Sequence, residues 1–321
     1  AGPAPGQRFL MSAFPATSQN QLSLFSSKDG LSYTSLASET WQPAKGLLRD
    51  PSILKTADGC WAIVYTTGWE GQSFGVARSC DLRAWNQVAD IQIDLPGLTN
   101  VWAPEWFRDA DGTVSVIVSL STGGKDANGQ VRGPFRAYRL QPTKADFTAF
   151  SAPRLLQGLD RNPIDTFIVR EGGRYIAFAK QETSKRIERA WANALEGPWT
   201  YDRLDDWAGW GGPVEGQSLV RIQDADGRPG WRIHFDDYIH KRYYFSDSFD
   251  GLNTWTARKE LIGVSGSVRH FTVIAEDERQ LAKATAPTGT PRKISWDKYS
   301  LKIDGQRQLI WAAEFQPFRL P

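Results

Sequence analysis

The 321-residue chain has very few of the side chains that bind transition metals or build disulfide frameworks. It contains two cysteines, three histidines and one methionine. Two cysteines are too few for a disulfide scaffold or a structural zinc site. Cys60 and Cys80 fall on neighbouring predicted strands, so they either form one disulfide bridge or remain as buried free thiols.

An excess of one charge and long apolar runs are also lacking. The 38 Lys and Arg residues nearly balance the 36 Asp and Glu residues, for a net charge of +2. Such a chain has no strong field to attract nucleic acid or an anionic membrane, and no apolar run approaches the roughly 18 residues of a membrane span. We therefore expect neither partner. The first residue is Ala1 rather than Met, which is consistent with a processed, secreted or periplasmic protein.

A repeat with intervals of 50 to 60 residues runs through the chain. Its copies are marked by four acids, Asp50, Glu105, Asp165 and Glu215, and His270 takes the fifth place. After each acid come a glycine and an apolar strand, predicted at residues 59–65, 112–118, 173–178 and 230–235. A further strand is predicted at residues 74–78, 135–140, 187–191 and 242–246. Repeats of about this length are typical of four-stranded propeller blades.

The repeat predicts an all-β protein, a five-bladed β-propeller that forms one domain over residues 1–321. The N-terminal strands at residues 9–14 and 21–26 complete the blade that begins at His270, and residues 309–315 add another strand to it. Closing the ring in this way leaves no long exposed edge. Residues 282–292, which include two prolines, are predicted to form a surface loop.

A propeller would bring the acids together if each lies on the innermost strand of its blade. Carboxyl groups that share a pocket raise one another's pKa, so one can keep its proton while another stays ionised. An inverting glycoside hydrolase needs this division: one carboxylic acid protonates the leaving oxygen, and a carboxylate about 6.5–9.5 Å away activates water. Sugar rings also stack on aromatic side chains, and Trp102 and Phe167 flank the acids.

Five ordered motifs together resemble glycoside hydrolase family 43, whose members are five-bladed propellers that hydrolyse arabinose-, xylose- and sometimes galactose-containing glycans with inversion. The resemblance covers residues 45 to 275. The motifs are Arg49-Asp50-Pro51-Ser52-Ile53, Trp102-Ala103-Pro104-Glu105, Asn162-Pro163-Ile164-Asp165-Thr166-Phe167, Glu215-Gly216 and Arg269-His270.

The resemblance implies a role for each motif. Asp50 matches the general base, Asp165 the acid that tunes and orients the proton donor, and Glu215 the general acid. His270 matches an axial histidine that in some members binds calcium, so a structural calcium ion on the axis is one expectation, although no cofactor is required. Trp102 and Glu105 match residues that line the pocket, and we expect Phe167, Arg269 and His270 to contact substrate.

Two motifs depart from the family pattern, which leaves the substrate subclass open. The proline expected after Asp165 stands instead at Pro163, and Gln217 replaces the usual proline near Glu215. Taken alone, each site residue also has an ordinary interpretation: Asp50 as a turn residue before Pro51, Glu215 as a loop acid and His270 as a core histidine.

The sequence therefore predicts a secreted or periplasmic, monomeric exo-glycosidase that releases terminal α-L-arabinofuranosyl residues from plant cell-wall polysaccharides. Its carbohydrate partner would contain arabinose or xylose. A β-xylosidase or a galactofuranosidase is the alternative within the enzymes, and a non-catalytic sugar-binding propeller or a protein-interaction platform the alternative outside them. Loops at residues 123–133 and 205–213 would build the walls of a closed pocket, which favours exo action over endo action.

Overall fold

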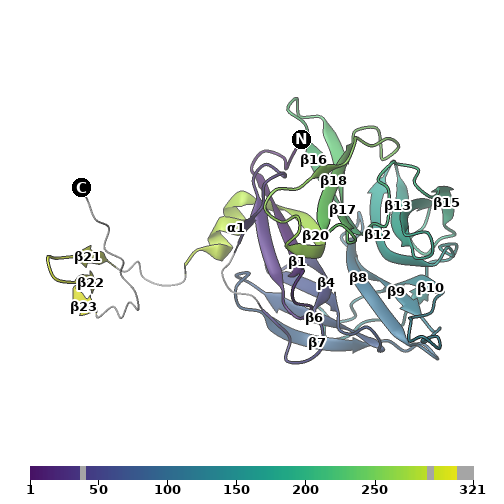
Figure 1. The fold of residues 1–321 in the computed structure, drawn as a ribbon, viewed down its shortest axis with the longest axis horizontal. Coiled ribbons are helices and arrows are strands. Elements are labelled where there is room, and N and C mark those ends of the chain that lie inside the picture. Colours follow the sequence, from purple (N-terminus) through teal and green to yellow (C-terminus); the bar gives the residue numbers. More distant parts are fainter. Residues whose placement is uncertain (37–40, 288–292, 309–321) are drawn as a thin grey trace. The chain divides into compact units, whose positions relative to one another are not determined.

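The computed structural model describes residues 1–36, 41–287 and 293–308. These residues form mostly antiparallel strands, and five of the sheets have four strands each (Figure 1). The one helix in the described ranges is α1 (Glu278–Thr285). No described helix has the length and apolar character to cross a membrane.

Four of the five sheets are built from consecutive strands, as the repeat predicts. The first contains β4 (Arg49–Lys55), β5 (Trp61–Thr66), β6 (Ser73–Ser79) and β7 (Asn86–Gln92). The second contains β8 (Asn100–Arg108), β9 (Val114–Ser121), β10 (Phe135–Leu140) and β11 (Arg154–Leu155). The third contains β12 (Pro163–Glu171), β13 (Arg174–Gln181), β14 (Arg186–Ala192) and β15 (Thr200–Arg203). The fourth contains β16 (Glu215–Gln223), β17 (Pro229–Asp237), β18 (Arg242–Ser248) and β19 (Lys259–Glu260).

The fifth sheet joins the N-terminal strands to the strand that carries His270. It contains β20 (Val268–Asp277), β1 (Gln7–Pro15), β2 (Ser23–Ser27) and β3 (Thr34–Ser35), in that order. β1 pairs antiparallel with β20, with Leu10 opposite Ile274. The predicted union of both parts of the chain in one sheet is confirmed. The further strand predicted at residues 309–315 lies outside the described residues.

The first strands of the sheets, β4, β8, β12, β16 and β20, are called the inner strands below. β4 contacts β8, β8 contacts β12, β12 contacts β16, β16 contacts β20, and β20 contacts β4. These contacts bring residues more than 200 positions apart in the sequence next to one another.

Apolar side chains fill the space between neighbouring sheets. Val64 and Phe74 of the first sheet, for example, share one buried cluster with Trp106 and Val118 of the second. Strands covered on both faces carry nearly continuous apolar runs, and β5 is buried along its whole length. Burial of such side chains stabilises the fold by roughly 1.5–3 kcal/mol for each large residue.

The contacts divide the chain into two compact units, residues 1–285 and 286–321, where the sequence analysis expects one domain. All five four-stranded sheets belong to the first unit. In the second unit, β21 (Ile294–Trp296), β22 (Leu301–Ile303) and β23 (Gln306–Gln308) form a small antiparallel sheet. The predicted loop at residues 282–292 is wrong at its start, because residues 282–285 complete α1, whose Leu281 is buried.

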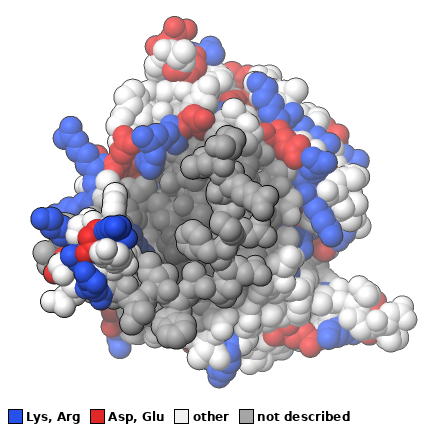
Figure 2. Space-filling view, turned by 60° about the vertical axis from the view of Figure 1, so that its left-hand side comes forward, with Lys and Arg blue, Asp and Glu red and all other residues white. Residues whose placement is uncertain are grey.

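Cys60, directly before β5, and Cys80, directly after β6, form a disulfide, which decides between the two alternatives that the sequence left open. Surface charge agrees with the balanced composition. Figure 2 shows Lys and Arg side chains interspersed with Asp and Glu over the visible described surface, without a large region of one sign.

Candidate active site

Each inner strand is irregular near its start. The pairing of β4 with β5 shifts register between Arg49 and Ser52, and that of β12 with β13 shifts between Ile164 and Phe167. At these shifts Asp50 and Asp165 adopt left-handed backbone conformations, with φ of 54° and 53°. Such bulges re-aim a side chain and concentrate next to active sites, and left-handed backbone at residues other than glycine costs of order 1–3 kcal/mol.

The same irregularity corrects the alignment of the repeats. The left-handed residue is His270 (φ 35°) in β20, but it is Ala103 (φ 48°) in β8 and Gly216 (φ 64°) in β16. Glu105 therefore lies two residues beyond the equivalent position, and Glu215 lies one residue before it. The similar spacing of the five ionisable residues suggested that they occupy equivalent positions in their strands. They do not.

The starts of all five inner strands nevertheless meet in one pocket with a volume of about 290 Å³, called the strand-start pocket below. Four cationic and four carboxylate side chains line it, together with His270 and three aromatic residues. Its lining consists of Arg49, Asp50, Thr66, Trp69, Trp102, Ile164, Asp165, Lys180, Glu182, Lys185, Glu215, Tyr238, Arg269 and His270. Six of the eight predicted site residues are thus brought together.

Asp50 is held as a carboxylate. Its oxygens lie 3.1 Å from Nδ1 of His270 and 2.7 Å from the Thr66 hydroxyl, which donates to it. Burial alone would raise the pKa of Asp50, but the charge and hydrogen bond of His270, with help from Arg49 and Thr66, hold it well below its usual range. An ionised carboxylate at the edge of a pocket can accept a proton from water.

Glu215 lies between two cations. Nζ of Lys180 is 2.6 Å from one carboxylate oxygen, and Nη2 of Arg269 is 3.0 Å from the other. Burial by itself would raise the pKa of Glu215, but Lys180 and then Arg269 outweigh it and lower the pKa. Glu215 is therefore ionised in the ligand-free protein.

Asp165 has no cation in such close contact. It accepts a hydrogen bond from the backbone N–H of Gly216 at 2.9 Å, and Nδ1 of His270 lies 3.8 Å away. Burial, with help from the charge of Glu215, raises the pKa of Asp165 to about 6 against the opposing charge of His270. The family resemblance implies that Asp165 tunes Glu215 as the proton donor, which would require a protonated Glu215. In the ligand-free protein the pKa of Asp165 is raised and that of Glu215 is lowered, because Lys180 and Arg269 stabilise the Glu215 carboxylate.

Glu105 lies beneath the pocket rather than in it. The residue is buried, its carboxylate is 3.5 Å from Nε2 of His270, and the Thr272 hydroxyl donates to it at 3.2 Å. Both ring nitrogens of His270 thus face carboxylates. Burial would lower the pKa of His270, but Asp50 and Asp165 raise it well above its usual value.

These surroundings suit a charged imidazolium, whereas a metal ligand must be a neutral imidazole. In the described part of the chain, no group of three or more His, Cys, Asp or Glu side chains is arranged to hold a metal ion. The residues around His270 therefore do not favour the expected calcium site.

Two tryptophans form the aromatic wall of the pocket. Trp102 stacks on Phe135 at 4.7 Å between ring centroids and donates through Nε1 to the Trp69 carbonyl. Trp69 is half exposed and packs on the Arg49 guanidinium at 4.4 Å. Rings held in this way can stack on the apolar face of a sugar.

Of the two predicted loop walls, one lies beside the pocket. Residues of the 123–133 loop line an adjacent hollow that shares Trp69 and Trp102 with the strand-start pocket. Trp207 and Trp210, from the 205–213 loop, instead pack on Phe178 in the core. That loop does not line the pocket in the described structure.

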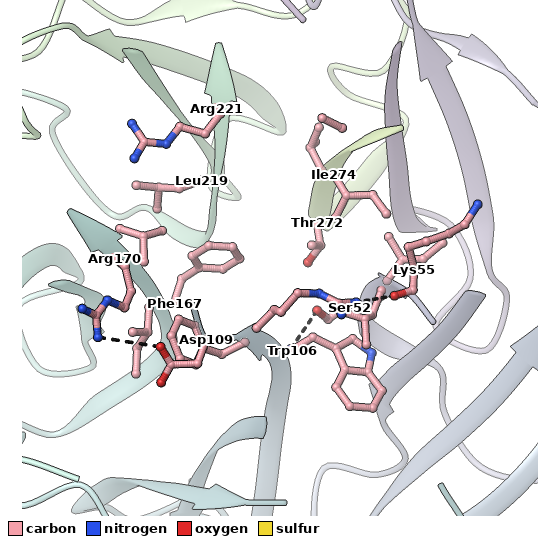
Figure 3. A pocket seen from close by; sticks show the side chains of 18 of the residues that line it. Ser52, Lys55, Trp106, Asp109, Phe167, Arg170, Leu219, Arg221, Thr272 and Ile274 are labelled. Carbon is pink, nitrogen blue, oxygen red and sulfur yellow. Dashed lines mark hydrogen bonds and ion pairs between the residues drawn. The ribbon is translucent and has the colours of Figure 1, made fainter. Parts of the chain in front are cut away.

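Phe167 lies in a different cavity, formed further along the inner strands and called the strand-end cavity below (Figure 3). It has a volume of about 440 Å³, and its lining combines apolar residues such as Leu219 and Ile274 with six charged side chains. Figure 3 shows Arg170 and Arg221 beside it, and Arg170 approaches Asp109 at 3.7 Å. Phe167 follows Asp165 by two residues, but the register shift between Ile164 and Phe167 breaks the alternation of the strand. Asp165 therefore lines the strand-start pocket, whereas Phe167 lines the strand-end cavity.

Sequence reasoning missed several residues near Glu215. Lys180 lies near the end of β13, Tyr238 follows β17, and Asp236 is paired in register with Glu215. The apolar strands were recognised, but a lysine or aspartate at their ends gave no signal in a single sequence. Strand pairing alone would have placed Asp236 opposite Glu215.

Comparisons with known proteins agree with this geometry. A family model described as a probable glycosyl hydrolase domain related to glycoside hydrolase family 43 matches residues 5–280. No curated protein matches the chain.

Several solved structures share the fold at low sequence identity. A putative exo-β-1,3-galactanase from Bifidobacterium bifidum is 14% identical with a TM-score of 0.55, over 79% of this chain and 89% of that one. An endo-1,4-β-xylanase from Bacteroides thetaiotaomicron is 14% identical with a TM-score of 0.55, over 82% and 93%. An endo-arabinase from the same organism is 15% identical with a TM-score of 0.50, over 70% and 84%. Because the family model spans most of the chain, the protein belongs to this family related to glycoside hydrolase family 43 and is a glycoside hydrolase.

Proposed function

We propose that the protein is an inverting exo-glycosidase built on a five-bladed β-propeller. The cyclic contacts of the inner strands support the propeller, and its fifth blade would be the sheet that joins β1 to β20. The observation that carries the function is the meeting of Asp50, Asp165 and Glu215 in one small pocket. Two carboxyl groups in different protonation states are what inversion requires.

Asp50 is the general base in this proposal. Its low pKa keeps it ionised, so it can take a proton from the water that attacks the anomeric carbon. Glu215 is the general acid that protonates the departing glycosidic oxygen, and Asp165 orients it through the backbone N–H of Gly216. Glu215 must gain a proton in the substrate complex, because Lys180 and Arg269 keep it ionised without substrate.

The substrate in this proposal is a terminal α-L-arabinofuranoside of a plant cell-wall polysaccharide. The volume of about 290 Å³ is at the lower end of the range for ligand pockets, roughly 300–1,000 Å³, which favours a single terminal sugar. The lining holds equal numbers of cationic and carboxylate side chains besides His270, which favours a neutral sugar. A β-xyloside or a galactofuranoside on the same scaffold is the second candidate, and the xylanase among the neighbouring structures supports the xyloside.

The non-catalytic alternatives are less well supported. A sugar-binding propeller or an interaction platform would not need three buried carboxyl groups around one hollow, which are costly to bury. The disulfide between Cys60 and Cys80 supports the proposed secreted or periplasmic location, since such bonds persist in oxidising compartments. The monomeric state and the absence of a required cofactor remain predictions.

A leaving-group comparison tests the roles of the two acids. Nitrophenyl arabinofuranoside, xyloside and galactofuranoside identify the sugar, and the corresponding alkyl glycosides supply a poor leaving group. Glu215→Gln should lower kcat/KM by about 10²–10⁴-fold on the alkyl glycoside but much less on the nitrophenyl glycoside, which needs little protonation. Asp50→Asn should lose activity on both substrates. Equal losses on both substrates for Glu215→Gln would contradict its assignment as the acid.

A further inference from the structure

Glu215 is the centre of an alternating row of five charged side chains. Lys180 lies 3.2 Å from Glu182 and 2.6 Å from Glu215. On the other side, Arg269 lies 3.0 Å from Glu215 and 3.3 Å from Asp236. The row contains three carboxyl groups and two cations, so it has one negative charge in excess when all three are ionised.

Asp236 differs from the other members of the row because it does not line the strand-start pocket. It lies on β17, paired in register with Glu215 of β16, and its exposed fraction is 2%. Its contact with the site is the Nε atom of Arg269, whose Nη2 atom donates to Glu215. Asp236 can therefore affect the reaction through Arg269 without touching substrate.

We propose that Asp236 is a positioning residue for the acid Glu215, which fixes the Arg269 guanidinium and thereby sets how strongly Arg269 stabilises the Glu215 carboxylate. An arginine shared between two carboxylates stabilises each less than an arginine devoted to one. The inference rests on the proposed function only in calling Glu215 the acid. The coupling between Asp236 and Glu215 is a property of the ligand-free protein.

The surroundings of Asp236 explain how it could release a proton for Glu215. The groups that face it are Glu215 from β16, Tyr243 from β18, and Arg269 and His270 from β20. Burial and then the charge of Glu215 raise the pKa of Asp236 to about 7, against the opposing cations. Near neutral pH the row can thus carry one proton. If Asp236 loses that proton and Glu215 gains one, the net charge of the row is unchanged, and Arg269 keeps one ionised partner.

The test compares Asp236→Asn with Asp237→Asn. Asp237 is the next residue of β17, is also buried, and binds His240 and Arg258 instead. Carboxyl ¹³C NMR would follow the titration of Glu215 in the ligand-free protein. In the wild type the Glu215 resonance should shift near pH 7, where Asp236 ionises and draws on Arg269, and again at the lower pH where Glu215 itself titrates. Asp236→Asn should lose the shift near pH 7 and Asp237→Asn should keep it, and the same shift in all three proteins would overturn the inference.

A second variant and a second readout separate this inference from the proposed function. Asp236→Glu keeps the carboxyl group and should keep the shift near pH 7, whereas its loss would contradict the inference. On alkyl glycosides, kcat/KM should fall above about pH 7 in the wild type but already above the lower Glu215 midpoint in Asp236→Asn, whereas activity on nitrophenyl glycosides should change much less. The NMR shift without glycosidase activity would leave the coupling standing and reject only the proposed function. Activity without the NMR shift would do the reverse.

Discussion

The same inner strands form two cavities that differ in which side chains they bring together. Where the strands begin, left-handed residues such as Asp50 and Asp165 turn ionisable side chains into a shared hollow. Further along, regular alternation returns, apolar side chains such as Phe167 face the strand-end cavity, and Arg221 is paired with Glu171 at 2.9 Å. The larger cavity is therefore not the one in which carboxyl groups converge. Local backbone irregularity, rather than cavity size, distinguishes the candidate active site.

Removing one charge from each cavity would test this contrast most strongly. Asp165→Asn should lower kcat by about 10²–10⁴-fold, because in the proposed mechanism Asp165 positions the acid through Gly216. Arg221→Met removes a charge at the strand-end cavity and should leave kcat/KM within about twofold. Steady-state kinetics on the best glycoside measures both variants. A comparable loss in Arg221→Met would mean that the strand-end cavity also takes part in catalysis.

Truncating an apolar side chain at the strand-end cavity should affect stability instead of catalysis. Phe167 is buried in a cluster with Val169 and Ile176, so Phe167→Ala should lower the free energy of unfolding by about 3 kcal/mol. Urea unfolding measures the loss, and kcat/KM below the transition should remain near the wild-type value. A stable variant with impaired turnover would instead support the prediction from the sequence that Phe167 contacts substrate.

These two cavities also mark how far the sequence could be interpreted. The strands were predictable because β-branched and aromatic residues alternate over short runs, and the acids were predictable because they recur ahead of those strands. The displacement of Glu105 and Glu215 from the position of Asp50 and Asp165 was not predictable, because the residue at a bulge need not have a distinctive side chain, as Ala103 shows. Lys180 and Asp236 escaped notice because their importance comes from pairing with a residue 35 or 21 positions away along the chain. The pKa direction of Glu215 depends on Lys180 and Arg269, and that of Asp165 depends on its burial, so neither could be assigned from the sequence.

The configuration of the first-formed sugar tests the central claim most directly. Proton NMR during hydrolysis of the preferred nitrophenyl glycoside detects which anomer appears before mutarotation. Water activated by Asp50 on the face opposite Glu215 predicts inversion, so an α-arabinofuranoside should release β-arabinose first. Initial release of the α-anomer would require a covalent intermediate and would contradict the division of labour between these two carboxyl groups.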